Sequence, residues 1–301
     1  MYEIRRRDFR KKTLDTGYSE ALITESLKQT REVYKMGNRL KDKVAVVTGA
    51  GSSGPGWGNG KATAVLFARE GAKVFAVDIN IDAVKETKEI IDQEGGECTV
   101  HRADVSKSEE VKDLVEQCIE TYGRIDILHN NVGIGAMGGP VETSEEDWDR
   151  VNEVNVKGVF LTCKYVLPYM EKQGGGVIVN ISSLASVCEA GVTFVSYTAS
   201  KAAINQLTKS VAVQYAKKNI RANCVIPGLL DTPMIVEPYK ARYGDVDKMR
   251  EIRAAQCPMG RMGDAWDTAH AALFLASDEA KFITGTHIIV DGGQSCVCGN
   301  L

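Results

Sequence analysis

The sequence predicts an α/β fold that is organised around a parallel β-sheet. The first observation is the run Val44-Ala45-Val46-Val47, which is continuous and largely β-branched, as is typical of a strand buried on both faces. The second is the glycine-rich stretch 48–60, which follows this run directly and leads into a helical pattern at 61–70. The third is the regular alternation of strand-like and helix-like segments along the rest of the chain, which favours a parallel sheet.

The remaining elements follow from apolar periodicity, capping residues and glycine stops. Ser144 is expected to cap one long helix that continues through Asn155 to Met170, because two glutamates lie in its first turn. The expected strands lie at 44–47, 72–77, 97–101, 125–129, 176–181, 220–226 and 286–290. The expected helices lie at 61–70, 81–92, 108–122, 144–170, 196–217 and 264–277, with two helical pieces within 235–263.

Composition places the chain among ordinary globular proteins. Of its 301 residues, 44% are hydrophobic and 26% are charged, and the net charge is −3. Residues 1–43 carry 12 Lys and Arg against 7 Asp and Glu, so the rest of the chain is acidic, which argues against a nucleic-acid-binding main domain. No apolar run reaches the roughly 18 residues of a membrane helix, and the N-terminus lacks the apolar core of a secretory signal.

The cysteines indicate a reducing compartment. Eight of them are scattered through apparent core segments, and without a signal peptide we interpret them as reduced thiols of a cytoplasmic protein. Cys296 and Cys298 form a close pair near the C-terminus, but without further ligands no metal site is predicted.

The first 40 residues are predicted to form a separate extension. Residues 1–17 are basic and lack periodicity, which is typical of a poorly ordered arm. From 19 to 36 the apolar residues follow one stripe of an amphipathic helix. So short a helix must bury its stripe, either on its own domain or on another subunit. We expect the main domain at 41–295 and a short tail at 296–301.

The glycine-rich stretch 48–60 indicates a dinucleotide site. A strand, a glycine-rich turn and a helix in succession bring backbone N–H groups and a helix N-terminus to a pyrophosphate. Asp78 ends the second strand, where an acid accepts both hydroxyls of an adenosine ribose and repels a 2′-phosphate. The next residues are Ile79 and Asn80, so no arginine is available for that phosphate. These features favour NAD over NADP; the other interpretation of Asp78 is a cap for the helix at 81–92.

Tyr197 and Lys201 carry the predicted chemistry. On a helix their i, i+4 spacing places both side chains on one face. A free phenol titrates near 10, and a neighbouring ammonium lowers that pKa, which makes tyrosine a usable acid or base toward an alcohol or carbonyl oxygen. Ser183 lies fourteen positions earlier and could bind the same oxygen. Such a Tyr–Lys pair alone also occurs by chance on ordinary helices.

Taken together, the motifs of the chain resemble those of the short-chain dehydrogenase/reductase family from Leu40 to Gln294. The resemblance implies a single doubly wound Rossmann domain, with a seven-stranded parallel sheet and helices on both faces. It also implies a homo-oligomer, usually a tetramer or a dimer, with the Asn155 and Tyr197 helices often at an interface. The motifs are the Thr48-Gly49 turn, Asp104-Val105, Asn130-Asn131-Val132-Gly133, Asn155, Ser183, Tyr197-x-x-x-Lys201, Pro227-Gly228 with Thr232, and Asp-Gly-Gly at 291–293.

The resemblance assigns residues to three groups. The catalytic tetrad comprises Asn155, Ser183, Tyr197 and Lys201. The residues expected around the cofactor are Gly49, Gly58, Asn59, Gly60, Asp78, Ile79, Asp104, Val105, Asn131, Val132, Gly133, Tyr197, Lys201, Pro227, Gly228, Leu230 and Thr232. The residues expected around the substrate are Ser183, Ala185, Cys188, Phe194, Tyr197, Leu229 and Met234.

The glycine-rich turn departs from the family pattern. Gly58 and Gly60 fall ten and twelve residues after Thr48, where five and seven are usual, so the turn contains a five-residue insertion with Pro55 and Trp57. We align Gly58 and Gly60, rather than Gly54 and Gly56, with the family's glycines, because the twenty residues from Gly58 to Asp78 match the usual spacing. The insertion either lengthens the phosphate loop or covers the pyrophosphate with Trp57. Val132 also replaces the family's usual alanine, a minor change.

These observations predict an NAD-dependent enzyme that interconverts a secondary alcohol and a ketone. The apolar residues beside the tetrad favour a small, fairly hydrophobic and uncharged substrate, which could be cyclic. Residues 233–263 are expected to form a mobile lid, in which Arg242, Lys248, Arg250 and Arg253 are expected mainly to face solvent. The alternatives are a carrier-bound 3-oxoacyl reductase that uses NADPH, an epimerase or dehydratase of the same fold, and a non-catalytic NAD-sensing scaffold.

Overall fold

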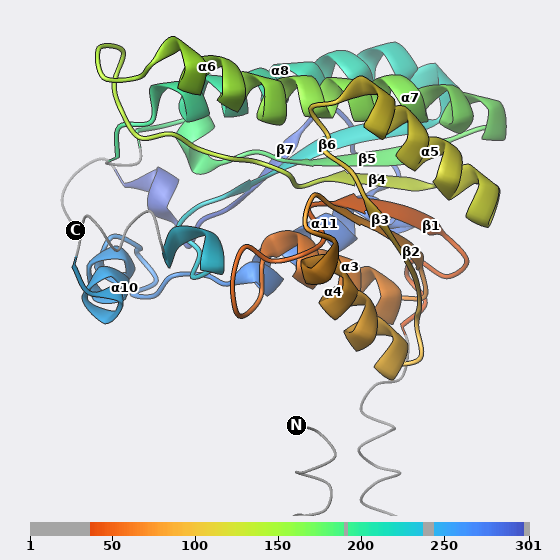
Figure 1. Cartoon of the computed structure of the whole chain (residues 1–301), viewed down its shortest axis with the longest axis horizontal. Helices are drawn as coiled ribbons and strands as arrows, with labels where there is room; N and C mark the ends of the chain where they lie inside the picture. Colours follow the sequence, from red (N-terminus) through yellow and green to blue (C-terminus); the bar gives the residue numbers. More distant parts are fainter. Residues whose placement is uncertain (1–36, 190–191, 237–243, 298–301) are drawn as a thin grey trace, which may run out of the picture. The chain divides into compact units, whose positions relative to one another are not determined.

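Seven parallel strands form the centre of the domain (Figure 1). The computed structural model describes residues 37–189, 192–236 and 244–297, so the expected N-terminal arm and helix lie outside the described residues. The order β3-β2-β1-β4-β5-β6-β7 reverses between β1 and β4, which is the switch point where open α/β sheets bind ligands. The strands are β1 (Val44–Thr48), β2 (Lys73–Asp78), β3 (Glu97–Arg102), β4 (Ile127–Asn130), β5 (Gly176–Ile181), β6 (Ile220–Pro227) and β7 (His287–Val290).

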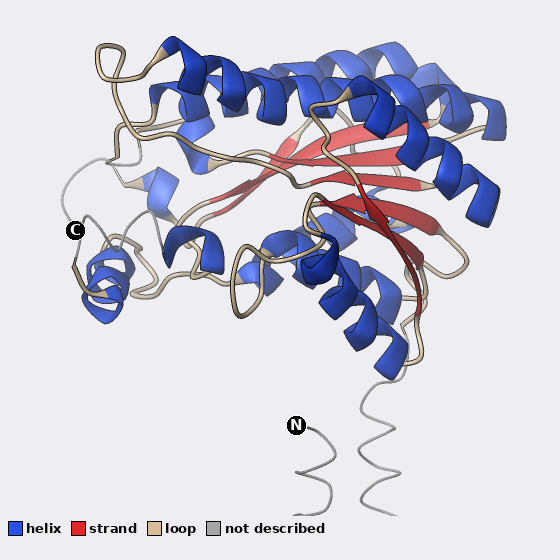
Figure 2. Cartoon of the chain, in the orientation of Figure 1, coloured by secondary structure: helices blue, strands red, loops and turns tan. Residues whose placement is uncertain are grey.

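Helices cover both faces of this sheet, which confirms the predicted doubly wound fold (Figure 2). One face carries α3 (Asn59–Arg69), α4 (Ile81–Gln93) and α11 (Ala265–Ala276). The other carries α5 (Ser108–Tyr122), α6 (Glu145–Asn152), α7 (Gly158–Gln173) and α8 (Val195–Tyr215). The chain between β6 and α11 contains α10 (Val246–Ala255). The short helices are η1 (Glu153–Lys157), η2 (Leu184–Ser186), η3 (Ala216–Lys218), η4 (Asp278–Ala280) and η5 (Gln294–Cys296).

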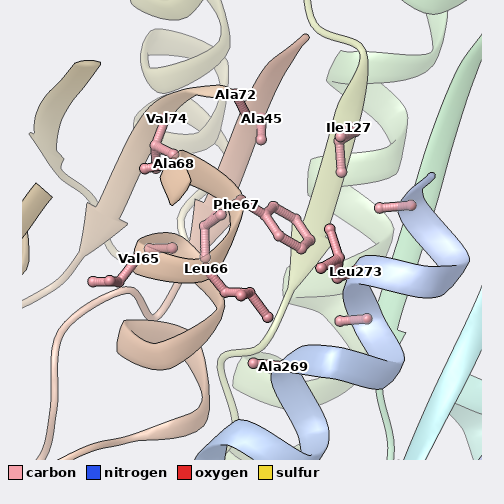
Figure 3. Packing of buried hydrophobic residues seen from close by; sticks show 14 of the residues in the cluster. Ala45, Val65, Leu66, Phe67, Ala68, Ala72, Val74, Ile127, Ala269 and Leu273 are labelled. Carbon is pink, nitrogen blue, oxygen red and sulfur yellow. The ribbon is translucent and has the colours of Figure 1, made fainter. Parts of the chain in front are cut away.

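The central position of β1 explains why residues 44–47 are apolar without interruption. Ala45 and Val47 belong to the core between the sheet and α3 and α11, whereas Val44 and Val46 belong to the core on the opposite face. In the first core the fully buried ring of Phe67 lies near Ile127 and Leu273 (Figure 3). Small residues along α11, such as Ala269, allow it to pack closely against α3.

The helix predicted for 144–170 is not one regular α-helix, so that prediction was wrong at one turn. Ser144 does cap α6, since its side chain accepts a hydrogen bond from the backbone of Asp147. The five residues of η1 then form a single π-helical turn before α7 begins. Asn155 lies in this wide turn with none of its surface exposed. Single π turns of this kind inside α-helices occur frequently at functional sites.

No helix in the part of the chain that the structure describes is long and apolar enough to cross a membrane.

Candidate active site

The predicted site residues gather at the carboxyl ends of the strands. Turns leave β1 at Gly49, β3 at Ala103 and β4 at Asn131, and each carries predicted cofactor residues. Asp78 is the last residue of β2, Ser183 follows β5, and Gly228 follows β6. Because all seven strands are parallel, these ends share one edge of the sheet, as open α/β sheets require of a ligand site.

The glycine-rich turn is closed tightly around Gly49 and Gly60. Gly49 has a left-handed backbone with φ +65°, and the side-chain amide of Asn131 donates a 3.0 Å hydrogen bond to its carbonyl. A side chain at Gly60 would overlap that same carbonyl oxygen. Gly58 is the N-cap of α3, with an extended backbone. Gly58 and Gly60, rather than Gly54 and Gly56, therefore occupy the entry to the helix.

The N-terminus of α3 offers polar groups that fit a dinucleotide. It has no side-chain cap and no acidic residue in its first turn, so its N–H groups remain available to an anion. The side-chain oxygens of Ser52 and Asn59 are buried beside it without a hydrogen-bond partner among the described residues. Buried polar atoms are normally satisfied, and a bound dinucleotide or an ordered water would supply the partner of each.

Asp78 belongs to the turn and does not cap a helix. Its carboxylate accepts hydrogen bonds from the backbone of Gly51 at 3.0 Å and of Asn80 at 2.9 Å. The cap of α4 is Asn80, whose side chain accepts from the backbone N–H groups of Asp82 and Ala83, so the capping interpretation of Asp78 is wrong. Ile79 beside it is 58% exposed, which is unusual for isoleucine.

The turns after β3 and β4 are stabilised by contacts within the protein. Asp104 accepts hydrogen bonds from the backbone and the hydroxyl of Ser106, at 2.9 and 2.8 Å. Val105 is buried, and a side chain at Gly158 of α7 would approach it to 2.9 Å. Val132 packs against the core on the α5 and α7 face.

Tyr197 and Lys201 lie on the same face of α8, as predicted. The Lys201 ammonium nitrogen lies 5.6 Å from the centre of the Tyr197 ring and donates a 2.9 Å hydrogen bond to the carbonyl of Ile181. Lys201 is only 2% exposed, and burial lowers its pKa to about 8. A side chain at Gly133 would lie 2.9 Å from the ammonium, and one at Gly135 would lie 3.6 Å from the Tyr197 ring. Glycines after β4 thus leave room beside both groups.

Asn155 joins the turn after β4 to α8. Its side-chain oxygen accepts from the backbone of Ile134, and its side-chain nitrogen donates to the Ile134 carbonyl and to the Ser200 hydroxyl, all at 2.9 Å. The π turn brings the amide between these two partners. Asn155 therefore fixes the backbone that faces Lys201.

The predicted substrate residues vary in exposure. Ser183 is the N-cap of η2, and its hydroxyl accepts a 3.3 Å hydrogen bond from the backbone of Ala185. The Phe194 ring meets that of Tyr197 edge to face, with centroids 6.0 Å apart. Leu229 is 8% exposed, whereas Met234 is 48% exposed. Cys188 is exposed too, and Leu230 is buried against Gly263.

Of the basic residues expected to face solvent on α10, Lys248 is exposed and Arg250 is half-exposed, but Arg253 is buried. Arg253 is only 5% exposed, so that expectation was wrong for this residue. Arg250 forms an ion pair of 3.0 Å with Asp231 and one of 3.2 Å with Asp247. Arg250 thus ties α10 to Asp231 in the segment after β6, while Arg242 lies outside the described residues.

A buried polar row beneath the site was not predicted. The side-chain amide of Asn130 on β4 donates a 2.9 Å hydrogen bond to Asn180, its register partner on β5, and the amide of Asn180 donates to Thr208 of α8 at 2.8 Å. Thr162 of α7 donates to Asn130 at 2.9 Å. An asparagine at the end of each of two apolar strands was the available signal for this row. Fully satisfied buried networks of this kind specify a unique packing.

The buried Lys201 predicts an unusual pH dependence of stability. Its pKa is about 8 in the folded protein against 10.5 for a free side chain, so between these values the unfolded chain binds more protons. The contribution of Lys201 to the free energy of unfolding therefore rises with pH across that interval. From pH 7.5 to 9.5 we expect the native protein to gain about 2 kcal/mol relative to Lys201→Met, as urea unfolding measures.

The comparison with Lys201→Met also removes a competing effect. Burial raises the pKa of Cys98, Cys118 and Cys163 to about 12, so their thiols destabilise the fold as pH rises. Both proteins share this contribution. A parallel response of the two proteins to pH would contradict a buried ammonium.

Known proteins with this fold share most of the chain. The sequence matches the family described as enoyl-(acyl carrier protein) reductase over residues 55–295. It is 52% identical to a protein from Burkholderia xenovorans described as a short-chain dehydrogenase/reductase, whose crystal structure gives a TM-score of 0.84 and aligns over 87% of this chain and 100% of that one.

Two curated relatives have named activities. The 3-oxoacyl-(acyl-carrier-protein) reductase of Thermotoga maritima is 43% identical, over 85% of this chain and 98% of its own. The cyclohexanol dehydrogenase of an Acinetobacter species is 38% identical, over 86% of this chain and 98% of its own. The chain therefore belongs to the short-chain dehydrogenase/reductase family, whose members are oxidoreductases that use a nicotinamide cofactor.

Proposed function

We propose that this protein is an NAD(H)-dependent oxidoreductase that interconverts a secondary alcohol and a ketone. The observation that carries the proposal is the buried Lys201 ammonium beside the Tyr197 ring, at the strand ends next to the glycine-rich turn. A nearby cation favours the phenolate form of tyrosine, which equips Tyr197 for proton transfer at moderate pH. The nicotinamide, when bound, would accept or supply the hydride.

The other members of the tetrad have separate proposed roles. Ser183 is proposed to orient the substrate oxygen and to stabilise the charge that develops on it. Lys201 is proposed to favour the phenolate form of Tyr197 and to hydrogen-bond the nicotinamide ribose. Both N–H groups of the Asn155 side chain already donate hydrogen bonds, to the Ile134 carbonyl and to the Ser200 hydroxyl. The side chain is therefore proposed to position the Ile134 backbone and α8. A water bound by Asn155 would have to contact atoms of the residue other than these two N–H groups.

The residues around β1 and β2 support NAD as the cofactor. The residues proposed to bind NAD are those that the sequence predicts around the cofactor, among them Gly49, Gly58, Gly60 and Asp78. The carboxylate of Asp78 is held by two backbone N–H groups, so it is oriented before any ligand binds. An oriented carboxylate at this strand end can accept the ribose hydroxyls and repels a 2′-phosphate.

Replacing Asp78 is expected to reduce the discrimination between the two cofactors. Asp78→Ala removes the repulsion, so the ratio of kcat/KM for NAD to that for NADP should fall by on the order of tenfold or more. Steady-state rates with both cofactors measure the ratio, and Asp82→Ala on the exposed start of α4 is the matched control. An unchanged ratio in Asp78→Ala would remove the assignment of Asp78.

The side chains near Tyr197 support a hydrophobic and uncharged alcohol. Phe194, Leu229 and Met234 supply apolar surface, and Ala185 adds a small side chain. The similarity to a cyclohexanol dehydrogenase agrees with a cyclic substrate. The similarity to a 3-oxoacyl reductase favours the second candidate, a carrier-bound substrate reduced with NADPH.

One experiment separates these candidates. The purified protein is mixed with NAD or NADP and a panel of cyclic and linear secondary alcohols, and the absorbance of the reduced cofactor is followed. In parallel, 3-oxoacyl thioesters are offered with NADH or NADPH. We expect the fastest turnover with NAD and an uncharged cyclic alcohol. Binding of NAD without turnover on any member of the panel would favour an NAD-sensing scaffold.

We also propose a cytoplasmic homo-oligomer, a tetramer or a dimer, that acts on a small molecule and binds neither nucleic acid nor membrane. Support comes from the family resemblance, which implies that the Asn155 and Tyr197 helices often lie at an interface. Phe160 on α7 and Val213 on α8 are 51% and 78% exposed on this side of the sheet. Light scattering of the purified protein measures the oligomeric state, and a monomer would contradict the proposal.

A further inference from the structure

The five-residue insertion in the glycine-rich turn is an excursion that closes at its base. The chain leaves at Gly51 and returns at Gly58, and a side chain at Gly58 would lie 3.4 Å from the Gly51 carbonyl. The turn around Gly49 and Gly60 is therefore complete without the insertion. Residues 53–57 must have another function, because they do not shape the entry to α3.

One end of the insertion is anchored on α11 by two tryptophans. The rings of Trp57 and Trp266 lie 4.7 Å apart, centre to centre, at 54°. The Lys61 ammonium lies 5.6 Å from the Trp57 ring, and the Arg69 guanidinium lies 4.9 Å from the Trp266 ring. Two aromatic rings with a cation beside each make a specific and favourable contact. Trp57 also packs against the buried core of that face.

The other part of the insertion reaches the segment after β6. A side chain at Gly54 would lie 3.4 Å from Pro233, and one at Gly56 would lie 3.6 Å from it. Gly56 has φ +113°, which few other residues adopt. Figure 1 shows this loop, in orange, extending toward the blue-green helical turn that follows β6.

This contact spans the edge of the sheet that carries the site. Strands β4 and β5 lie between β1 and β6, so the insertion and Pro233 belong to segments that leave strands three positions apart in the sheet. Neighbouring strands are about 4.8 Å apart, so β1 and β6 lie roughly 14 Å from each other. Pro233 directly follows Thr232, a predicted cofactor residue. The insertion thus links the two sides of the proposed dinucleotide site.

We propose that residues 53–57 form a strap that retains the dinucleotide, and that Trp57 and Pro233 are positioning residues that hold the strap. The inference rests on the proposed function, because it assumes a dinucleotide at these strand ends. A strap held at both ends before binding loses little conformational freedom when the ligand enters. A ligand that spans both sides leaves only when the strap loosens, so the strap slows release.

The rate of NADH release tests the strap directly. The full-length protein is loaded with NADH, excess NAD is added in a stopped-flow instrument, and the fluorescence of bound NADH is followed. Trp57→Ala and Pro233→Ala are each expected to accelerate release by on the order of tenfold, since contact losses appear mainly in dissociation rates. Trp57→Phe keeps an aromatic ring against Trp266 and should restore most of the slow release.

Controls separate the strap from a general loss of structure. Trp148→Ala removes a tryptophan that is 41% exposed on α6, and it should release NADH at the native rate. Deletion of residues 53–57 restores the usual length of the turn and should accelerate release, with a thermal unfolding midpoint no lower than that of Trp57→Ala. If Trp57→Ala fails to fold, the Pro233→Ala and deletion variants still decide the question.

Two outcomes would overturn the inference, and they differ in meaning. Native release rates in Trp57→Ala, Pro233→Ala and the deletion variant, with NADH bound normally, would refute the strap alone. Failure of the native protein to bind NADH or NADPH would refute the proposed function and the strap with it.

Discussion

Replacing Tyr197 with phenylalanine is expected to reduce turnover by about 10²–10⁴-fold, which is the usual contribution of one general acid or base. The ring and its contact with Phe194 remain, so packing at the start of α8 should change little. The Lys201 ammonium stays in place through its hydrogen bond to the Ile181 carbonyl. Affinity for NADH should therefore stay close to the native value. Steady-state kinetics and a fluorescence titration with NADH measure the two quantities.

A second tyrosine provides the matched control. The hydroxyl of Tyr165 on α7 shares a 2.8 Å hydrogen bond with Ser108, and Tyr165 is half-buried, as Tyr197 is. Tyr165→Phe removes the same atom outside the proposed site and should retain native turnover. If Tyr197→Phe kept most of its turnover, or if both variants lost it equally, Tyr197 would not be the proton-transfer group.

The sequence was sufficient for the sheet and for the edge at which the site lies. The run at 44–47 is apolar at every position because alternate residues enter two different cores, and this pattern identifies a central parallel strand. Once the strands are parallel, every motif that follows a strand must lie at the same edge. The i, i+4 spacing of Tyr197 and Lys201 then needs only a helix to bring the two side chains together.

The features that were missed depend on contacts between distant parts of the chain. The π turn places Asn155 between Ile134 and Ser200, and no local pattern in the helix reveals those partners. Trp57 finds Trp266 across more than two hundred residues. Arginine side chains on a helix usually face solvent, yet the packing of α10 buries Arg253. Propensity and periodicity describe single elements, whereas these three features arise where elements meet.

The position of the family's glycines is the sequence inference that the structure supports most sharply, and it leads to a second large expected effect. A methyl group at Gly60 would overlap the carbonyl oxygen of Gly49 and lie 2.6 Å from the side-chain nitrogen of Asn131. Neither neighbour can withdraw easily, because Gly49 already has φ +65° and Asn131 bonds its carbonyl. Gly60→Ala is therefore expected to lower the free energy of unfolding by about 3 kcal/mol, the upper end of ordinary overpacking costs.

The same substitution should also distort the turn that faces the dinucleotide, so affinity for NADH is expected to fall at least about tenfold, or 1.4 kcal/mol. Gly54→Ala is the matched control, because its methyl group would meet Pro233 at an ordinary contact distance of 3.4 Å. It should remain within about 0.5 kcal/mol of the native stability, as surface substitutions usually do. Urea unfolding and NADH titration measure both variants. If Gly54→Ala lowered stability and NADH affinity while Gly60→Ala changed neither, Gly54 and Gly56 would be the dinucleotide-binding glycines. The position at which α3 needs a glycine for close backbone packing would then lie inside the insertion.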